Sequence, residues 1–114
     1  MKPKHYARGC LPPGQMNRTE ALYEQRLQIL KQTGTIQWFA YEAIKLKLAD
    51  KTYYTPDFLV LNSDGMLECH EVKGFWRDDA RVKIKVAAQK FPFRFLAVTM
   101  QSKKVGGGWD VEYF

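Results

Sequence analysis

The sequence predicts one α/β domain in which two helices flank a mixed β-sheet. A chain of 114 residues with 46% hydrophobic residues is long enough for one packed core, and it shows no internal repeat or domain boundary. Two segments place apolar residues at helical spacing, and short segments rich in β-branched and aromatic residues surround them. The resulting order is a helix, a run of four strands, a helix and two strands, which is typical of an α/β core with mixed strand pairing.

Residues 17–34, NRTEALYEQRLQILKQTG, are predicted to form the first helix. Asn17 is a suitable N-cap with Glu20 three residues later, and Gly34 provides a C-terminal stop. The second helix is predicted for DDARVKIKVAAQK, whose apolar side is set against a largely basic surface. Residues 1–16 combine basic residues with proline and glycine, which predicts a mobile or extended basic arm ahead of a folded domain, residues 17–114.

The strands are predicted from β-rich segments bounded by turn residues. Alternation in IQWFAYEAIKLKLAD predicts one or two strands before a turn at Asp50 and Lys51. TYYTPDFLVL and MLECHEVK follow as the two strands of a hairpin. FRFLAVTM and WDVEYF are the last two strands, separated by a loop that contains Lys103 and Lys104.

The turn NSDG sets the register of the hairpin. A loop of residues 63–65 places Gly65 at the left-handed position that a three-residue turn commonly requires. Counting outward from this loop, Asp57 lies opposite Glu71. Side chains two positions apart share a face of a strand, so Asp57, Glu71 and Lys73 are expected to converge at one end of an otherwise apolar face.

The charge balance favours a polyanionic partner such as DNA. Eighteen Lys and Arg residues against twelve Asp and Glu give a net charge of +6, although a basic surface without a partner is the alternative. Cys10 and Cys69 lie far apart in unlike contexts, so neither a disulfide framework nor a zinc spacing is indicated. No apolar run reaches the roughly 18 residues that span a bilayer, and no signal peptide is recognisable. We therefore expect a soluble, cytoplasmic protein with no membrane partner.

The opposed carboxylates predict a metal site. Directly opposed residues have Cβ atoms about 4.5 to 5.5 Å apart, so Asp57 and Glu71 repel each other unless a cation lies between them. Mg²⁺ is usually held by one or two carboxylates, water and substrate phosphate, so Asp57, Glu71 and the Val72 carbonyl form a suitable half-shell. Lys73 would orient or deprotonate the attacking water, or neutralise charge on phosphate. The chemistry that fits is phosphodiester hydrolysis, and the alternative is a structural ion pair that closes the hairpin.

These residues resemble the signature of the PD-(D/E)xK, or restriction-endonuclease-like, nucleases. The dipeptide PD ends at Asp57, and fourteen positions later the triplet EVK, residues 71–73, begins. From about residue 17 to residue 100, the wider pattern is similar to a family of small phage and prophage nucleases in that superfamily. The resemblance implies a restriction-endonuclease-like core and an Mg²⁺-dependent DNA endonuclease, with Mn²⁺ as a substitute. It also implies a resolvase-like action on branched DNA in phage recombination or processing. A homodimer is then expected, because symmetric cutting of two strands usually requires two active sites.

The resemblance further implies that the first helix contributes an acidic residue to the metal site. The matching position is Glu20, with Glu24 one turn later on the same helical face as the alternative. The competing interpretation of Glu20 is a capping-box residue that serves Asn17.

Basic residues on and just before the second helix are candidates for binding DNA phosphates, and a solvated basic face is the alternative. These residues are Arg77, Arg81, Lys83, Lys85 and Lys90. His70 falls on the opposite strand face from Glu71 and has no histidine cluster around it, which favours a structural or surface role. Cys69 faces apolar neighbours, which favours a buried thiol. Two other functions remain open: an inactive nucleic-acid-binding module with the same fold, and an assembly protein with an incidental basic surface.

Overall fold

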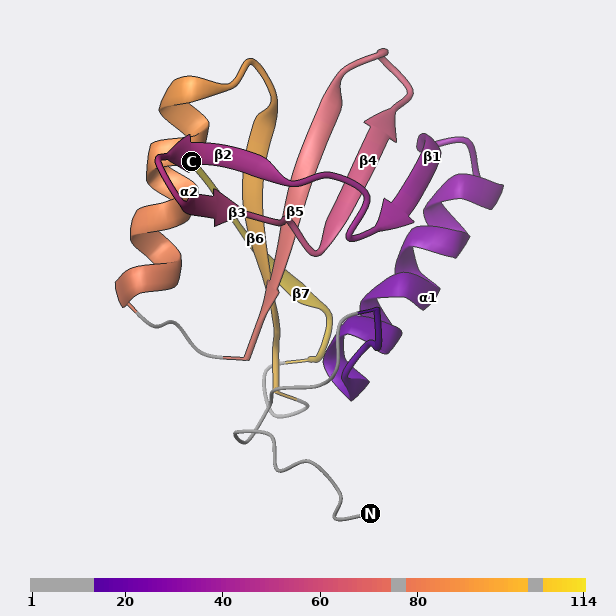
Figure 1. The fold of residues 1–114 in the computed structure, drawn as a ribbon. Coiled ribbons are helices and arrows are strands. Elements are labelled where there is room, and N and C mark those ends of the chain that lie inside the picture. The colour runs from indigo at the N-terminus through magenta and orange to yellow at the C-terminus, as the bar shows by residue number, and fades with distance from the viewer. Residues whose placement is uncertain (1–13, 75–77, 103–105) are drawn as a thin grey trace, which may run out of the picture.

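The computed structural model describes residues 14–74, 78–102 and 106–114, and it has the mixed α/β architecture that the sequence predicts (Figure 1). Most of the expected basic arm, Arg77 and the two lysines of the last loop lie outside the described residues. The elements in chain order are α1 (Arg18–Gln32), β1 (Ile36–Tyr41), β2 (Leu46–Ala49), β3 (Thr52–Tyr54), β4 (Phe58–Asn62), β5 (Leu67–Lys73), α2 (Asp78–Lys90), β6 (Arg94–Met100) and β7 (Trp109–Tyr113).

Five strands form one mixed sheet in the order β1-β4-β5-β6-β7. β5 and β6 are parallel, with α2 as the connection between them, and the other neighbouring pairs are antiparallel. A parallel pair needs a crossover of this kind, which a tight turn cannot supply. The predicted mixed pairing is therefore confirmed.

The hairpin of β4 and β5 has the predicted register. Leu61 pairs with Leu67, and Leu59 pairs with Cys69. The turn closes through a hydrogen bond of 3.0 Å from the Gly65 amide to the Asn62 carbonyl, and Gly65 has a φ of 85°. A glycine meets this left-handed requirement without steric cost, which is why the NSDG sequence fixes the alignment.

The predicted run of four strands before α2 was wrong, because the structure has five there. The segment TYYTPDFLVL divides into β3 and β4, and residues 55–57 lie between them. Pro56 is fully buried at this break, and proline lacks the amide hydrogen that a continuous strand would donate. β2 and β3 pair with each other as a separate two-stranded sheet, which we call the ribbon.

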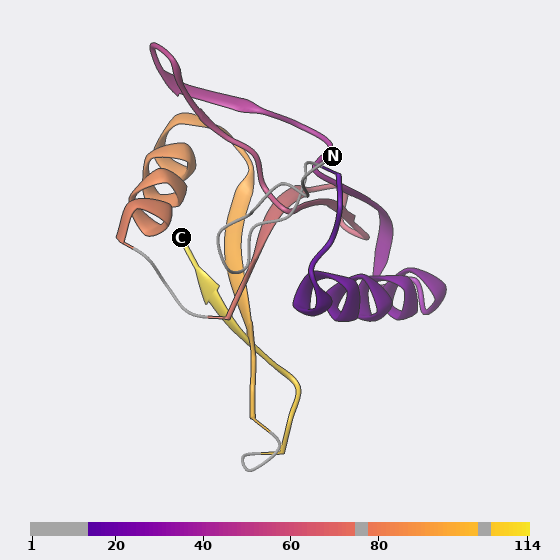
Figure 2. The ribbon, with the colours of Figure 1, turned by 60° about the horizontal axis from the view of Figure 1, so that its bottom comes forward.

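Two hydrophobic cores fill the two faces of the main sheet. On one face, α1 contributes Tyr23 and Leu27 to a core that also contains Val72 of β5. On the other face, α2 and the ribbon pack over a core that contains Cys69 of β5. Cys69 and Val72, three positions apart on β5, thus face opposite layers, and α1 and α2 lie on opposite sides of the sheet (Figure 2). No helix in the described part of the chain is long and apolar enough to cross a bilayer.

Candidate functional site

Asp57 lies immediately before β4, and backbone amides of two neighbouring segments hold it there. Its Oδ2 atom accepts a hydrogen bond of 2.8 Å from the amide of Val72, on the neighbouring β5. Its carbonyl accepts a second bond of 2.8 Å, from the amide of Glu42 just after β1. These bonds join the start of β4 to both of its neighbours. The carboxylate is thereby held beside Val72 of β5. Continuing the β4–β5 register by one residue beyond Phe58 and His70 would place Asp57 opposite Glu71.

Glu71 is a buried carboxylate with one oxygen left without a partner. The residue is only 6% exposed, and its Oε2 atom lies 3.6 Å from Nζ of Lys73. Its Oε1 atom has no hydrogen-bond partner. No other buried side-chain oxygen or nitrogen of the described residues lacks one. An unsatisfied buried acceptor is costly, so this oxygen is suited to receive a ligand.

Glu20 reaches the same region from the first turn of α1. The expected capping box is present, because the Asn17 side chain accepts from the Glu20 amide and Glu20 Oε1 accepts from the Asn17 amide, at 2.8 and 2.9 Å. The hydroxyl of Tyr41 donates to the same Oε1 atom over 3.3 Å. Glu20 is 8% exposed and interacts electrostatically with Asp57. The same side chain therefore caps α1 and lies near the site, so its capping role does not exclude a role in the site. Glu24, one turn later, is partly exposed.

The three carboxyl groups all bind protons more tightly than ordinary acids. Burial, followed by the charge of Glu71, raises the pKa of Asp57 to about 8. Burial raises the pKa of Glu20 to about 7, against the bond from the Asn17 amide. Burial also raises the pKa of Glu71, although the ammonium group of Lys73 opposes the shift. Without a cation, the group therefore holds protons near neutral pH.

The donor set fits a two-carboxylate ion site rather than a larger cage. No group of three or more His, Cys, Asp and Glu side chains within the described residues is arranged to hold a metal ion. Glu20 interacts with Asp57, and its role as a further ligand stays a prediction. Mg²⁺ usually needs only one or two carboxylates, completed by water and substrate phosphate. Asp57, the unpartnered Glu71 oxygen and the Val72 carbonyl meet that requirement.

Tyr54 and Tyr41 are site residues that the sequence analysis missed. Tyr54 ends β3, is buried, and has a pKa raised by burial and then by the charges of Glu71 and Asp57. Strand alternation was the signal that could have revealed it. Tyr54 pairs with Leu46, and both side chains lie on the buried inner face of the ribbon. Tyr41 is at the end of β1 and contacts α1 through Glu20, a relation between distant segments that no local pattern reveals.

The basic residues of α2 divide into two groups. Arg81 forms two hydrogen bonds with the carboxylate of Glu112 on β7, so its guanidinium group links α2 to the sheet. Lys90 donates a hydrogen bond of 2.6 Å to the carbonyl of Leu48, which links α2 to the ribbon. Lys83 and Lys85 are exposed, as a phosphate-binding residue needs to be. Arg77 lies outside the described residues.

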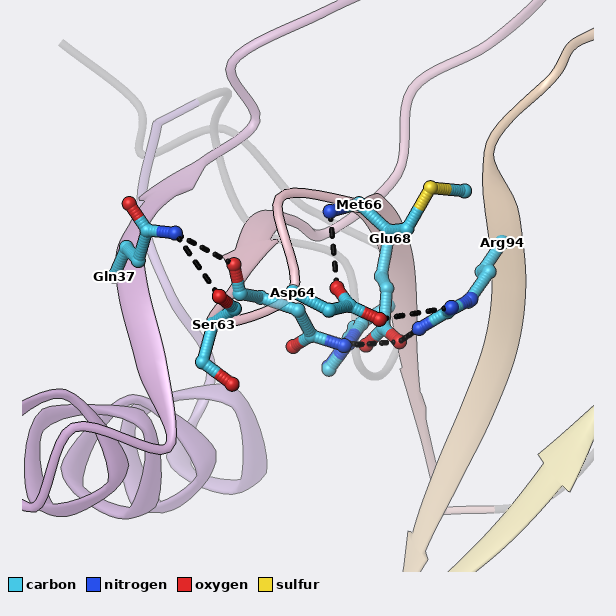
Figure 3. A network of polar contacts seen from close by, with 8 residues as sticks. Gln37, Ser63, Asp64, Met66, Glu68 and Arg94 are labelled. Carbon is cyan, nitrogen blue, oxygen red and sulfur yellow. Dashed lines mark hydrogen bonds and ion pairs between the residues drawn. The ribbon is translucent and has the colours of Figure 1, made fainter.

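His70 lies on the opposite face of β5 from Glu71, as predicted, and is buried in a structural network. Its Nδ1 atom lies 2.6 Å from the hydroxyl of Tyr23, and its Nε2 atom lies 2.8 Å from Glu68 Oε1. Glu68 also contacts Arg94, which pairs with Asp64 of the hairpin turn at 2.9 Å (Figure 3). This network ties α1, the hairpin and β6 together. Asp64 lies at the hairpin turn, whereas His70 pairs with Phe58, next to Asp57.

Cys69 is a buried thiol, as expected from its apolar neighbours. It is 1% exposed, and burial raises its pKa to about 12. A thiol of this kind stays protonated and is a poor nucleophile.

The comparisons with known proteins identify a family but no function. A family model described as "Protein of unknown function (DUF1064)" matches residues 16–107. The search of curated proteins gave no match, and neither did the search of solved structures. The matched range contains α1, both strands of the hairpin, the ribbon and α2, and hence every residue of the site described above.

Proposed function

The chain belongs to the DUF1064 family, and we propose that it is a metal-dependent DNA endonuclease of the PD-(D/E)xK type. The observation that carries the proposal is that the carboxyl groups of Asp57 and Glu71 interact electrostatically while Oε1 of Glu71 is buried without a hydrogen-bond partner. Half-buried Asp57 and buried Glu71 both have raised pKa values and compete for protons in the metal-free protein. A divalent cation removes that conflict, which a structural ion pair with Lys73 alone does not.

Hydrolysis consumes one water and breaks one phosphodiester P–O bond, giving a phosphate monoester and a hydroxyl group. When bound, Mg²⁺ supplies Lewis-acid stabilisation of the phosphate charge. Asp57, Glu71 and the Val72 carbonyl would hold the ion, and the amide of Val72 keeps Asp57 in position. Lys73, whose ammonium group lies 3.6 Å from Glu71, would orient the attacking water or neutralise the charge that develops on phosphate.

DNA is the proposed substrate because the chain carries a net charge of +6, and a basic surface attracts the anionic phosphate backbone of DNA. Lys83, Lys85 and Lys90 of α2 are exposed candidates for phosphate contacts. Branched DNA, as cut by resolvases, is the proposed preferred form, and a homodimer would supply the two sites that symmetric cutting usually needs. Such an enzyme would act in the cytoplasm, on phage or bacterial DNA.

The principal competing function is a nucleic-acid-binding module with the same fold and no catalysis. A binding module has no need for an unpartnered carboxylate beside a second buried acid, because anions repel the DNA backbone. The unpartnered oxygen of Glu71 therefore favours the enzyme.

A cleavage panel separates the two functions. Branched, duplex and single-stranded DNA are incubated with protein in Mg²⁺, in Mn²⁺ and in EDTA. Asp57→Asn, purified in the same way, controls for contaminating nuclease. The proposal expects cleavage with either metal, none in EDTA and none by the variant. Binding without cleavage under any metal would identify a binding module, and neither binding nor cleavage would favour an assembly protein.

A further inference from the structure

The ribbon of β2 and β3 is a distinct element that stands apart from the main sheet. Figure 2 shows its turn extending at the top of the view, beyond α2 and the strands of the main sheet. Its inner face carries Leu46, Leu48 and Tyr54, all buried against α2 and β6 residues. Lys90 fastens it to α2 through the Leu48 carbonyl. The ribbon is thus anchored on one face and open on the other.

The outer face of the ribbon combines exposed lysines with an exposed aromatic ring. Lys47 pairs across the strands with Tyr53, which is 40% exposed. Lys45 Nζ lies 4.4 Å from the centroid of the same ring. Lys51, at the turn, is exposed as well. Asp50 is the single acidic residue between positions 45 and 54, so the outer face is strongly basic.

The ribbon is joined directly to the candidate site. Tyr53 and Tyr54 are consecutive and point to opposite faces of β3, one to solvent and one toward the carboxyl groups of Glu71 and Asp57. Only Thr55 and Pro56 separate Tyr54 from Asp57. Tyr53 is four positions from Asp57, a span of at most about 14 Å in an extended chain, so a duplex on the outer face lies close to the site.

We propose that the outer face of the ribbon, Lys45, Lys47, Lys51 and Tyr53, binds duplex DNA beside the scissile phosphate. A two-stranded ribbon has a width that the major groove admits, and lysines along it neutralise phosphates. Tyr53 supplies an apolar contact to sugar or base edges. The choice of DNA as occupant rests on the proposed function, and the charge complementarity and continuity with the site support it independently.

The test measures binding in EDTA, where no cleavage occurs. The ribbon variant Lys45→Gln, Lys47→Gln and Lys51→Gln keeps the aliphatic stems and most of the local packing. The matched control removes three positive charges from exposed positions of α1, on the opposite side of the sheet: Arg18→Gln, Arg26→Gln and Lys31→Gln. Circular dichroism and thermal melting establish that both variants fold. Duplex and single-stranded DNA of equal length are titrated over a range of salt concentrations.

The ribbon variant should bind duplex at least about tenfold more weakly than the control variant at low salt. Its salt slope should fall by about 0.9 for each phosphate that the ribbon no longer neutralises. Tyr53→Ala should weaken duplex binding without changing the salt slope. Equal affinities of the ribbon and control variants would overturn the inference, and equal weakening on duplex and single strand would reject the duplex as occupant.

These results are separable from the proposed function. If the protein never cuts DNA but the ribbon variant binds duplex more weakly than the control variant, the binding surface is supported and the endonuclease activity is contradicted. If the protein cuts DNA and the ribbon variant binds duplex as tightly as the control variant, the endonuclease activity is supported and the binding surface is contradicted.

Discussion

At the scale of single residues, burial raises the cost of charge on the acids of the site. Asp57 is half-buried and Glu71 is buried, and the ammonium group of Lys73 lies 3.6 Å from the carboxylate of Glu71. Desolvation is therefore the largest cause of the raised pKa of each acid. Groups of this kind cost stability when they ionise, and functional sites are where that cost is tolerated.

The stability of the metal-free protein should fall as pH rises from about 4 to about 8. The pKa of Asp57 is raised from 3.8 to about 8 on folding, so the folded state binds the proton more tightly and loses that advantage as the group ionises. Asp57→Asn stays uncharged and can still accept from the Val72 amide. It should melt at a higher temperature than wild type at pH 8 in EDTA, with a flatter pH profile.

Thermal melting across this pH range checks the expectation, and Asp50→Asn, at an exposed turn of the ribbon, is the matched control. The control should keep the wild-type profile. If Asp57→Asn melted below wild type at every pH, Asp57 would be a structural residue instead.

Lys73→Ala should reduce turnover far more than DNA affinity. One lysine beside the reacting phosphate acts mainly on the transition state, where acid–base and charge contributions are worth about 10² to 10⁴ in rate. Single-turnover rates and dissociation constants provide the two numbers, with Lys31→Ala on α1 as control. Comparable reductions in rate and affinity would make Lys73 a binding residue only.

At the scale of elements, α2 combines structural and surface lysines and arginines that the sequence does not distinguish. Arg81 pairs with Glu112, thirty-one positions later, and Lys90 bonds to a carbonyl forty-two positions earlier. Local sequence contains neither relation, so all basic residues of α2 were equal candidates for binding DNA. Lys83 and Lys85 are exposed, and so is Lys90, although Lys90 also bonds to the ribbon.

The double variant Lys83→Ala, Lys85→Ala should weaken binding to unrelated DNA sequences and flatten the salt dependence by about 0.9 for each phosphate involved. Cleavage at saturating DNA should persist, because the paired carboxylates are untouched. Filter binding and cleavage assays on the same preparations give both quantities. Normal binding with abolished cleavage would move one of these lysines into the active site.

At the scale of the whole molecule, the sequence predicted the hairpin well because its signals are local. A glycine that must be left-handed and apolar residues that must pair fix the register between Leu61 and Leu67. The turn of the ribbon at Asp50 and Lys51 was predicted, but the separation of the ribbon from the main sheet was not, because it results from packing on α2 and from the break at Pro56. Tyr54 escaped notice for the same reason. The unpartnered oxygen of Glu71 likewise depends on three-dimensional packing.

The most direct test of the central claim is the Mg²⁺-dependent cleavage rate of Glu71→Gln beside wild type. The substitution removes the charge of the buried carboxylate and keeps its size. The account predicts a folded variant that binds DNA in EDTA and does not cut it in Mg²⁺, while wild type does. Cleavage by Glu71→Gln at the wild-type rate would show that the paired carboxylates do not form the active site.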